Sequence, residues 1–316
     1  MMRVAILDDI HRAWAATDGV RRLRQRAEVE IFTAPFGTPA VLAGFDALIA
    51  NRERTRFTRE LLAQLAGVRI IVQTGNHANH VDFAAAHDHH IVVARASTGH
   101  STGAAELTIG LAIAVMRRIA AGDAAIRRGE WETPSTPVLH GKTIGIVGFG
   151  GIGQHVGRLA GAFGMRVLAW SRSLTDEQAA AGGAERRELD LLLAESDLVS
   201  IHASLSPSSR DLIDARRIAL MKPGAYLVNT SRGPLVNEAA LVAALRDTRI
   251  AGAGLDVFDH EPLPSGHPLT TLPNVVLTPH LGWPTDDGYE RFAEAACKVL
   301  FAFMDGGDVP RFSPHA

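Results

Sequence analysis

The sequence has little cysteine, no strong excess of charge of either sign and no long apolar run. Its 316 residues include one cysteine, Cys297, which excludes an internal disulfide and makes a reducing cytoplasm the expected compartment. Lys and Arg number 32 against 34 Asp and Glu, so no basic excess is available for a nucleic-acid backbone. The longest apolar run, residues 104–116, is shorter than a membrane span, and the acidic Asp8 and Asp9 come too early for a secretory signal. We therefore expect a cytoplasmic protein with neither a membrane nor a nucleic-acid partner.

Glycine, in contrast, is abundant and forms a motif in the middle of the chain. The apolar residues 144–147 are followed by Gly148, Gly150 and Gly153, which fit the pattern G-x-G-x-x-G. In that pattern the first glycine permits a tight turn, the second lets the backbone approach a pyrophosphate, and the third lets the next helix pack on its strand. Helical spacing follows the motif, and residues 166–170 resemble a second strand, so the segment is predicted to be a βαβ dinucleotide site.

Apolar runs alternate with helical patterns on both sides of this motif. Before it, strands are expected at 3–7, 29–32, 45–50, 68–73 and 91–94, with a long buried helix from Ser101 or Thr102 to about Ala121. After it, strands are expected at 144–147, 166–170, 198–201, 225–229, 251–256 and 275–278, and a last helix at 288–304 that returns to the first domain. We expect an α/β protein with two Rossmann-like doubly wound parallel sheets and a cleft between them. The flavodoxin-like substrate domain would be discontinuous, 1–100 and 285–316, and the dinucleotide-binding domain would span 101–284.

Six histidines between residues 77 and 100 raise the question of a metal site. They are His77, His80, His87, His89, His90 and His100. Their spacing matches no established ligand set, and an exposed helix end followed by a turn accounts for the group at 87–90. We therefore expect no metal.

Three loops follow strands of the second domain and should open at the same sheet edge. The first holds Arg232 beside a glycine, where a guanidinium could hold a carboxylate through two parallel hydrogen bonds, although a surface ion pair is the plainer alternative. The third holds His280 directly after a proline. A histidine with a nearby carboxylate is the usual general acid–base arrangement, and the second loop offers three such carboxylates, Asp256, Asp259 and Glu261.

These segments together resemble the D-isomer-specific 2-hydroxyacid dehydrogenase family, which includes D-3-phosphoglycerate dehydrogenases, D-lactate dehydrogenases and glyoxylate/hydroxypyruvate reductases. The matching segments are residues 148–153, 229–238, 254–262 and 277–283, supported by 105–108 and 221–224, in the same order across nearly the whole chain. The resemblance places the family's catalytic arginine, glutamate and histidine at Arg232, Glu261 and His280. It also implies that Asp256 contacts the nicotinamide carboxamide and that the protein is a homodimer.

The resemblance implies hydride transfer between NAD(P)H and C2 of a small 2-oxo acid, the product being a D-2-hydroxy acid. Arg232 would bind the substrate carboxylate, and His280, paired with Glu261, would supply the proton. The remaining candidate substrate-binding residues are Asn76, His77 and Trp283, which are bulkier than the residues usual at these family positions. The candidate cofactor-binding residues are Thr108, Gly148, Gly150, Gly151, Ile152, Gly153, Ser171, Arg172, Ser173, His202, Ala203, Thr230, Ser231, Arg232, Asp256, His280 and Gly282. A compact acid such as glyoxylate or hydroxypyruvate is the expected substrate.

The residues after the second strand of the motif bear on which cofactor is used. NAD-specific members carry an acidic residue there for the ribose 2′-hydroxyl, whereas this chain has Ser171. No carboxylate would repel a 2′-phosphate, and Arg172 with the hydroxyls of Ser171 and Ser173 could bind one, which favours NADP. If Arg172 only stacks on adenine, NAD or both cofactors would be used.

Two other functions are compatible with this fold. A dinucleotide-sensing corepressor-like protein would need no catalytic residues, whereas all three positions are filled here. A formate- or phosphite-oxidising relative is the other alternative, and the glutamate at 261 argues against formate because formate enzymes of this fold generally have glutamine there. Fold alone does not choose among these functions.

Overall fold

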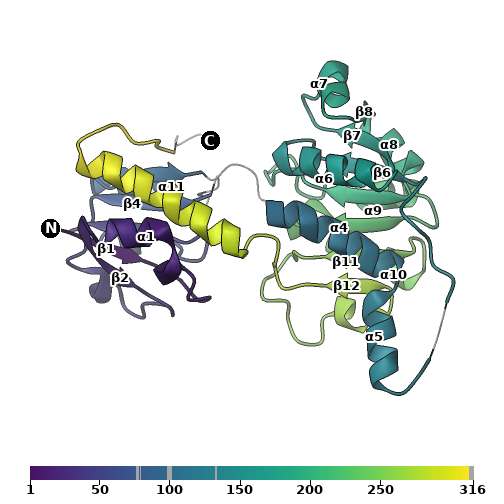
Figure 1. Ribbon diagram of the computed structural model, residues 1–316, viewed down its shortest axis with the longest axis horizontal. Helices are drawn as coiled ribbons and strands as arrows, with labels where there is room; N and C mark the ends of the chain where they lie inside the picture. Colours follow the sequence, from purple (N-terminus) through teal and green to yellow (C-terminus); the bar gives the residue numbers. More distant parts are fainter. Residues whose placement is uncertain (76–77, 79, 98–101, 132–133, 313–316) are drawn as a thin grey trace. The chain divides into compact units, whose positions relative to one another are not determined.

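The computed structural model describes residues 1–75, 78, 80–97, 102–131 and 134–312. The chain divides into two compact units, one of Met1–Gly99 with Pro284–Ala316 and the other of His100–Trp283 (Figure 1). Helix α11 therefore belongs to the first unit although it follows the second in sequence.

The first unit is built on a five-stranded parallel sheet in the order β2-β1-β3-β4-β5, which is the flavodoxin-like order. Its strands are β1 Met2–Ile6, β2 Ala27–Ile31, β3 Ala47–Ala50, β4 Ile70–Thr74 and β5 Val92–Ala96. Its helices are α1 Asp18–Leu23, α2 Arg59–Leu62, α3 Phe83–Asp88 and α11 Asp286–Met304, with short 3₁₀ turns at Trp14–Ala16 and Pro39–Leu42.

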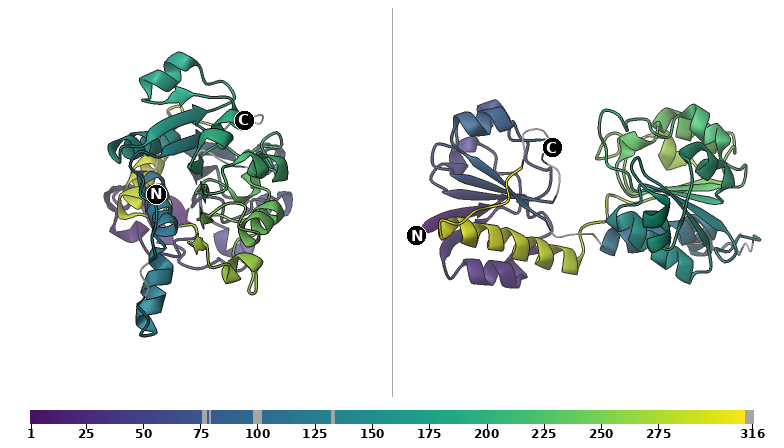
Figure 2. Two further views of the ribbon diagram at one scale, coloured as in Figure 1. Left: turned by 90° about the vertical axis from the view of Figure 1, so that its right-hand side faces the viewer. Right: turned by 90° about the horizontal axis from the view of Figure 1, so that it is seen from above.

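Helices α1 and α11 lie together against one face of this sheet, and α2 and α3 cover the other (Figure 2). The close approach of α1 and α11 depends on Gly19, since a Cβ there would lie 2.7 Å from the carbonyl carbon of Ala293. Thr17 begins α1 and Thr285 begins α11, each accepting a backbone N–H through its hydroxyl.

The second unit has a seven-stranded parallel sheet in the order β12-β11-β10-β9-β6-β7-β8. Its strands are β6 Thr143–Val147, β7 Arg166–Trp170, β8 Glu185–Arg186, β9 Leu198–Ile201, β10 Tyr226–Asn229, β11 Gly252–Leu255 and β12 Val275–Leu277. Its helices are α4 Thr102–Met116, α5 Ile119–Arg127, α6 Gly151–Ala162, α7 Asp176–Ala181, α8 Leu189–Glu195, α9 Ala215–Leu220 and α10 Glu238–Arg246, with 3₁₀ turns at Gly233–Leu235 and Pro268–Thr271. The strand order reverses between β6 and β9, where sheets of this kind bind their ligands beyond the carboxyl ends of the strands.

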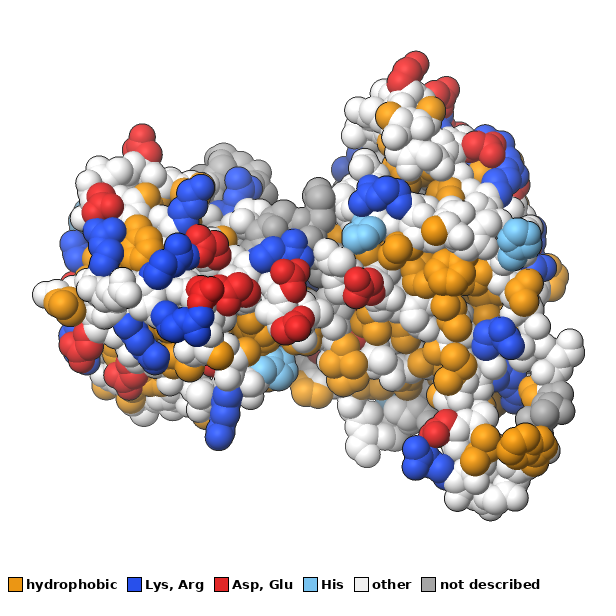
Figure 3. Space-filling model, viewed as in Figure 1, with side chains coloured by type: hydrophobic (Ala, Val, Ile, Leu, Met, Phe, Trp, Pro, Cys, Tyr) orange, Lys and Arg blue, Asp and Glu red, His pale blue; other side chains and the backbone are white. Residues whose placement is uncertain are grey.

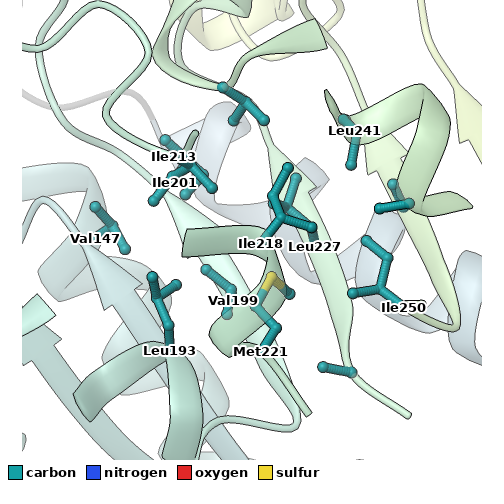
Figure 4. Close-up of a cluster of buried hydrophobic side chains, with 14 of the residues drawn as sticks. Val147, Leu193, Val199, Ile201, Ile213, Ile218, Met221, Leu227, Leu241 and Ile250 are labelled. Atoms are coloured by element: carbon teal, nitrogen blue, oxygen red, sulfur yellow. The ribbon is translucent and has the colours of Figure 1, made fainter. Parts of the chain in front are cut away.

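Alternate residues of the second sheet are buried on opposite faces, as expected for parallel strands covered on both sides. On one face, Val147, Val199, Ile201 and Leu227 pack with apolar residues of α8, α9 and α10 (Figure 4). On the other face, residues such as Ile146 pack with α4 and α6. The two cores hold the carboxyl ends of β6, β9, β10 and β11 in one register.

The expected strands and the buried helix from Thr102 are confirmed, but the prediction that this helix runs to about Ala121 is wrong. Helix α4 ends at Met116, and Arg118 adopts a left-handed conformation with φ of 54° before α5 begins at Ile119. The two charges of Arg117 and Arg118 end the apolar stretch, so the chain leaves the core at this point.

Strand β8 and helices α7 and α8 were not anticipated. Strand β8 is a two-residue charged edge strand without an apolar pattern. Among the described residues, no helix combines the length and apolarity that crossing a bilayer requires.

Candidate active site

The glycine motif forms the turn between β6 and α6. Gly148 has φ of +101°, and a Cβ there would lie 2.3 Å from the backbone nitrogen of Ala203. A Cβ on Gly153 would lie 2.2 Å from the Gly148 carbonyl oxygen, so α6 packs directly on the turn. Around Gly150, in contrast, a Cβ would meet no atom within 4 Å. Helix α6 begins with Gly151 and Ile152, and the space in front of its first amides is therefore open to an anionic ligand.

Ser171 joins the end of β7 to this turn. Its hydroxyl accepts a 2.6 Å hydrogen bond from the backbone N–H of Phe149, between the first two glycines. The next residue, Arg172, donates through Nη2 to the Ser208 hydroxyl at 2.8 Å, and Ser173 is exposed beside it. Ser208 was not anticipated, because it lies in a loop after β9 with no strand or helix pattern.

The loops after β9 and β10 are joined behind the turn. The Ser231 hydroxyl donates to the Ala203 carbonyl at 2.7 Å, and the hydroxyl oxygens of Thr230 and Thr108 lie 2.8 Å apart. His202 Nε2 lies 2.7 Å from the Ser200 hydroxyl, and burial lowers the pKa of His202 to about 4. This imidazole is therefore neutral near pH 7, and its contact to the cofactor stays a prediction.

Arg232 lies in a loop whose backbone is fixed by Asn229. The Asn229 side chain accepts from Ser231 N at 3.0 Å and donates to the Arg232 carbonyl at 2.9 Å. The Arg232 guanidinium donates through Nη1 to the Ser231 carbonyl at 2.7 Å. The next residue, Gly233, passes against the loop after β11, since a Cβ there would lie 2.0 Å from the carbonyl carbon of Phe258. The Arg232 loop and the Glu261 loop are thus in direct contact.

His280 and Glu261 form a hydrogen-bonded pair. Nδ1 of His280 lies 2.7 Å from Oε2 of Glu261, and the Phe258 N–H donates to Oε1 of the same carboxylate at 3.0 Å. Burial alone would raise the pKa of Glu261, but the hydrogen bond from His280, the Phe258 N–H and the positive charge of Arg232 outweigh it, and the pKa is lowered. Glu261 is therefore ionised near pH 7 and acts as the acceptor, which orients the His280 ring with Nε2 directed away from the carboxylate.

Asp256 is fully buried, and its carboxylate is bound by the loop that carries His280. It accepts from the Thr278 hydroxyl at 2.6 Å, from Leu281 N at 2.7 Å and from Gly282 N at 2.9 Å. His280, whose φ is 57°, donates its own N–H to the Asp256 carbonyl at 3.0 Å. Burial raises the pKa of the Asp256 carboxyl against the opposing effect of these donors. The anchoring of the loop by Thr278 was not anticipated. The expected contact of Asp256 to nicotinamide stays a prediction.

The candidate substrate residues are only partly described. Asn76 and His77 lie outside the described residues, while Trp283 is half-buried at the end of the second unit. On the first unit, Gly75 has φ of +96°, and a Cβ there would lie 2.9 Å from Nη1 of Arg52.

The histidines of the first unit do not converge in the part of the chain that the structure describes. His80 is half-buried, with Nε2 3.1 Å from the Gln73 side-chain oxygen, and burial lowers its pKa. His87, His89 and His90 are exposed, and His100 lies outside the described residues. No group of three or more His, Cys, Asp or Glu suited to a metal ion occurs among the described residues.

Comparison with known proteins gives this architecture a family. The NAD-binding-domain model of the D-isomer specific 2-hydroxyacid dehydrogenases matches residues 109–282. A glyoxylate reductase of Thermococcus litoralis is 36% identical over 303 residues, which cover 92% of this chain and 91% of that protein. A D-3-phosphoglycerate dehydrogenase of Methanocaldococcus jannaschii is 35% identical over 308 residues, 95% of this chain but 58% of the relative. The crystal structure of a putative D-3-phosphoglycerate dehydrogenase oxidoreductase from Ralstonia solanacearum superposes with a TM-score of 0.90 at 35% identity, covering 99% of this chain and 97% of that one.

The fold and the glycine turn define an α/β oxidoreductase with a site for a nicotinamide dinucleotide. The chain belongs to the D-isomer-specific 2-hydroxyacid dehydrogenase family, whose activity is nicotinamide-dependent hydride transfer between 2-hydroxy acids and 2-oxo acids.

Proposed function

We propose that this protein reduces a small 2-oxo acid, with Arg232, Glu261 and His280 as its catalytic residues. The observation that carries the proposal is the 2.7 Å pairing of His280 with Glu261, a carboxylate on which the charge of Arg232 also acts. When bound, a nicotinamide cofactor would supply a hydride to C2 of the acid. Arg232 binds the carboxylate and polarises the carbonyl, and His280 donates the proton from Nε2 to the carbonyl oxygen as it becomes a hydroxyl. Glu261 accepts from Nδ1 and holds the ring in this orientation.

The glycine turn fits a dinucleotide pyrophosphate. At Gly148 and Gly153 neighbouring backbone atoms leave no room for a side chain, whereas the surroundings of Gly150 are open. That combination leaves the first amides of α6 accessible to the pyrophosphate while the turn itself is held rigidly. Thr108, Ala203, Thr230 and Ser231 support the adjoining loops.

We propose NADPH as the preferred cofactor. Ser171 uses its hydroxyl as an acceptor for Phe149, so the position usual for the acidic residue of NAD enzymes holds the phosphate turn instead. The Arg172–Ser208 hydrogen bond places a guanidinium next to a hydroxyl, and both groups can donate to a 2′-phosphate. Use of NADH or of both cofactors would follow if Arg172 stacks on adenine alone.

The proposed substrate is a compact acid such as glyoxylate or hydroxypyruvate. The glyoxylate reductase from Thermococcus litoralis supports this choice, since the match covers 91% of that protein. The test is a set of initial rates for NADPH and NADH with glyoxylate, hydroxypyruvate, pyruvate, 2-oxoglutarate and a bulky aromatic 2-oxo acid. We expect turnover with NADPH and the small acids. If no acid were turned over although the cofactor binds, the proposal would be contradicted, and phosphite oxidation or a dinucleotide sensor would be the better assignment.

We further propose that the protein is a homodimer that associates through α5. Hydrophobic side chains lie at the surface over this helix (Figure 3), where Ile119 and Ile126 are 53% and 60% exposed. A hollow of about 230 Å³, lined among others by Arg118, Tyr226 and Asn274, adjoins the start of α5. A second copy would cover this apolar surface through a self-complementary contact, as symmetric dimers do.

The proposed location is the cytoplasm. Cys297 is buried in α11, and burial raises the pKa of its thiol to about 12, so it remains a protonated packing residue. A fold that uses its only cysteine in this way does not depend on an oxidising compartment.

A further inference from the structure

A second histidine–carboxylate pair lies behind the loop that carries Glu261. Nε2 of His267 is 3.1 Å from Oε1 of Glu238, and the two side chains are only 18% and 20% exposed. We propose that this Glu238–His267 pair positions Glu261 for its hydrogen bond to His280. The inference rests on the proposed function and adds two positioning residues to it.

The hydrogen bonds of His267 specify its tautomer. The backbone N–H of Leu269 donates to Nδ1 of His267 at 3.3 Å, where the residue caps the 3₁₀ turn Pro268–Thr271. Since Nδ1 accepts, the ring proton of the neutral imidazole is on Nε2 and is donated to Glu238. The pair is therefore directional, with His267 donating and Glu238 accepting, and it does not need a charged imidazole.

The other oxygen of Glu238 reaches the Glu261 loop. Oε2 accepts from the backbone N–H of Asp259 at 3.3 Å, while Glu238 itself stands at the first position of α10. The same Phe258–Asp259 peptide is touched by Gly233, whose Cβ position lies 2.5 Å from Asp259 N. The peptide is thus held by the α10 carboxylate and by the backbone that follows Arg232.

This peptide is adjacent to the catalytic carboxylate. The Phe258 N–H donates to Oε1 of Glu261, whose Oε2 pairs with His280. That N–H belongs to the preceding Val257–Phe258 peptide, which shares the Cα of Phe258 with the Phe258–Asp259 peptide. A shift of the Phe258–Asp259 peptide would therefore turn the Phe258 N–H and rotate the carboxylate relative to the imidazole. Catalytic rates depend steeply on such sub-ångström placement.

The charged groups around the pair agree with a hydrogen-bonded Glu238. Burial raises the pKa of Asp259, and the negative charge of Glu238 raises it further, against the nearby positive charge of Arg210. A carboxylate of Glu238 this close to Asp259 is unfavourable unless hydrogen bonds stabilise its oxygens. Both oxygens accept a hydrogen bond here.

Three variants separate the hydrogen bond from simple packing. Glu238→Ala removes the acceptor. In His267→Asn, the side-chain oxygen replaces Nδ1 as acceptor for the Leu269 N–H, but the side chain is too short to reach Glu238. In His267→Gln, the amide N–H replaces that of Nε2 and still donates to Glu238, but the acceptor for Leu269 is lost. Glu177→Ala, which removes an acidic side chain from the first turn of α7, is the matched control.

Each variant is measured for kcat, for KM of the acid, for the Kd of NADPH and, without substrate, for the pKa of Glu261 by carbon NMR. We expect Glu238→Ala and His267→Asn to lower kcat on the order of tenfold with the Kd of NADPH unchanged within about twofold. Both should also raise the pKa of Glu261 toward its ordinary value of 4.5. His267→Gln and Glu177→Ala should stay within about twofold of the parent kcat.

Unchanged kcat and unchanged Glu261 titration in Glu238→Ala would overturn the inference. Equal losses in His267→Asn and His267→Gln would also overturn it, because the effect would then belong to the ring and not to its bond with Glu238. If the parent protein turned over no 2-oxo acid, the proposed function would fail, and the Glu261 titration would still decide the positioning role.

Discussion

Thr278 donates its hydroxyl to the Asp256 carboxylate at 2.6 Å, and this bond connects the end of β12 to the residue that follows β11. The same carboxylate also accepts the N–H groups of Leu281 and Gly282. The loop that carries His280 is consequently folded around one buried anion.

Replacing that anion should weaken the loop. In Asp256→Asn, an NH₂ group replaces one of the two carboxylate oxygens that accept from Thr278, Leu281 and Gly282. At least one of these donors therefore loses its acceptor. We expect a loss of about 1–3 kcal/mol in the free energy of unfolding, measured by urea denaturation, together with a lower kcat. Asp287→Asn, at a side chain 62% exposed in α11, should change neither value. Parent-like stability and rate in Asp256→Asn would mean that the loop does not depend on the carboxylate.

Arg172 should discriminate between the two cofactors. Arg172→Ala removes the guanidinium that lies beside Ser208, so we expect the Kd of NADPH to rise on the order of tenfold or more, with a much smaller change for NADH. Cofactor fluorescence titration measures both constants, and Arg158→Ala on the exposed side of α6 serves as the control. Equal weakening of the two cofactors would leave Arg172 with an adenine-stacking role only.

The contribution of Glu261 to stability should depend on pH in a defined direction. Its pKa is lower in the folded protein than its ordinary 4.5, so the unfolded chain binds the proton more tightly. The stabilisation is therefore complete above 4.5 and is lost as the pH falls through the folded-state pKa. Denaturation of the parent and of Glu261→Gln from about pH 7 to about pH 3 should show a difference that shrinks with acid. A difference independent of pH would show that the hydrogen bonds to Glu261 do not favour its ionised form.

The α5 surface should decide the oligomeric state. Ile126→Glu places a charge on a residue that is 60% exposed, and we expect light scattering to show a shift from dimer to monomer. Leu191→Glu, on the 56% exposed Leu191 of α8, should leave the dimer intact. A dimer unaffected by Ile126→Glu would place the subunit contact elsewhere.

Periodic patterns and the glycine motif were sufficient to predict both sheets and the turn after β6. Choosing among Asp256, Asp259 and Glu261 from the residues alone was not possible, because that choice depends on the path of one loop. In the structure the loop is set by Gly233 against Phe258, which makes Glu261 the partner of His280 and turns Asp256 toward Thr278. Contacts between segments this far apart leave no periodic signal in the sequence.

The break after Met116 and the Glu238–His267 pair were missed for similar reasons. A helix-favouring composition continues through residues 119–127, and only the turn of Arg117 and the left-handed Arg118 separates the two helices. Glu238 and His267 are 29 residues apart, and each has an ordinary local explanation, as a first-turn acid and as a cap.

In the proposed reaction, His280, held by Glu261, supplies the proton to the reduced carbonyl. The most direct measurement is the rate of NADPH-dependent glyoxylate reduction by His280→Gln, with the Kd of NADPH determined on the same protein. We expect a loss of about 10²–10⁴-fold in kcat while the cofactor still binds. Turnover close to that of the parent protein would contradict it.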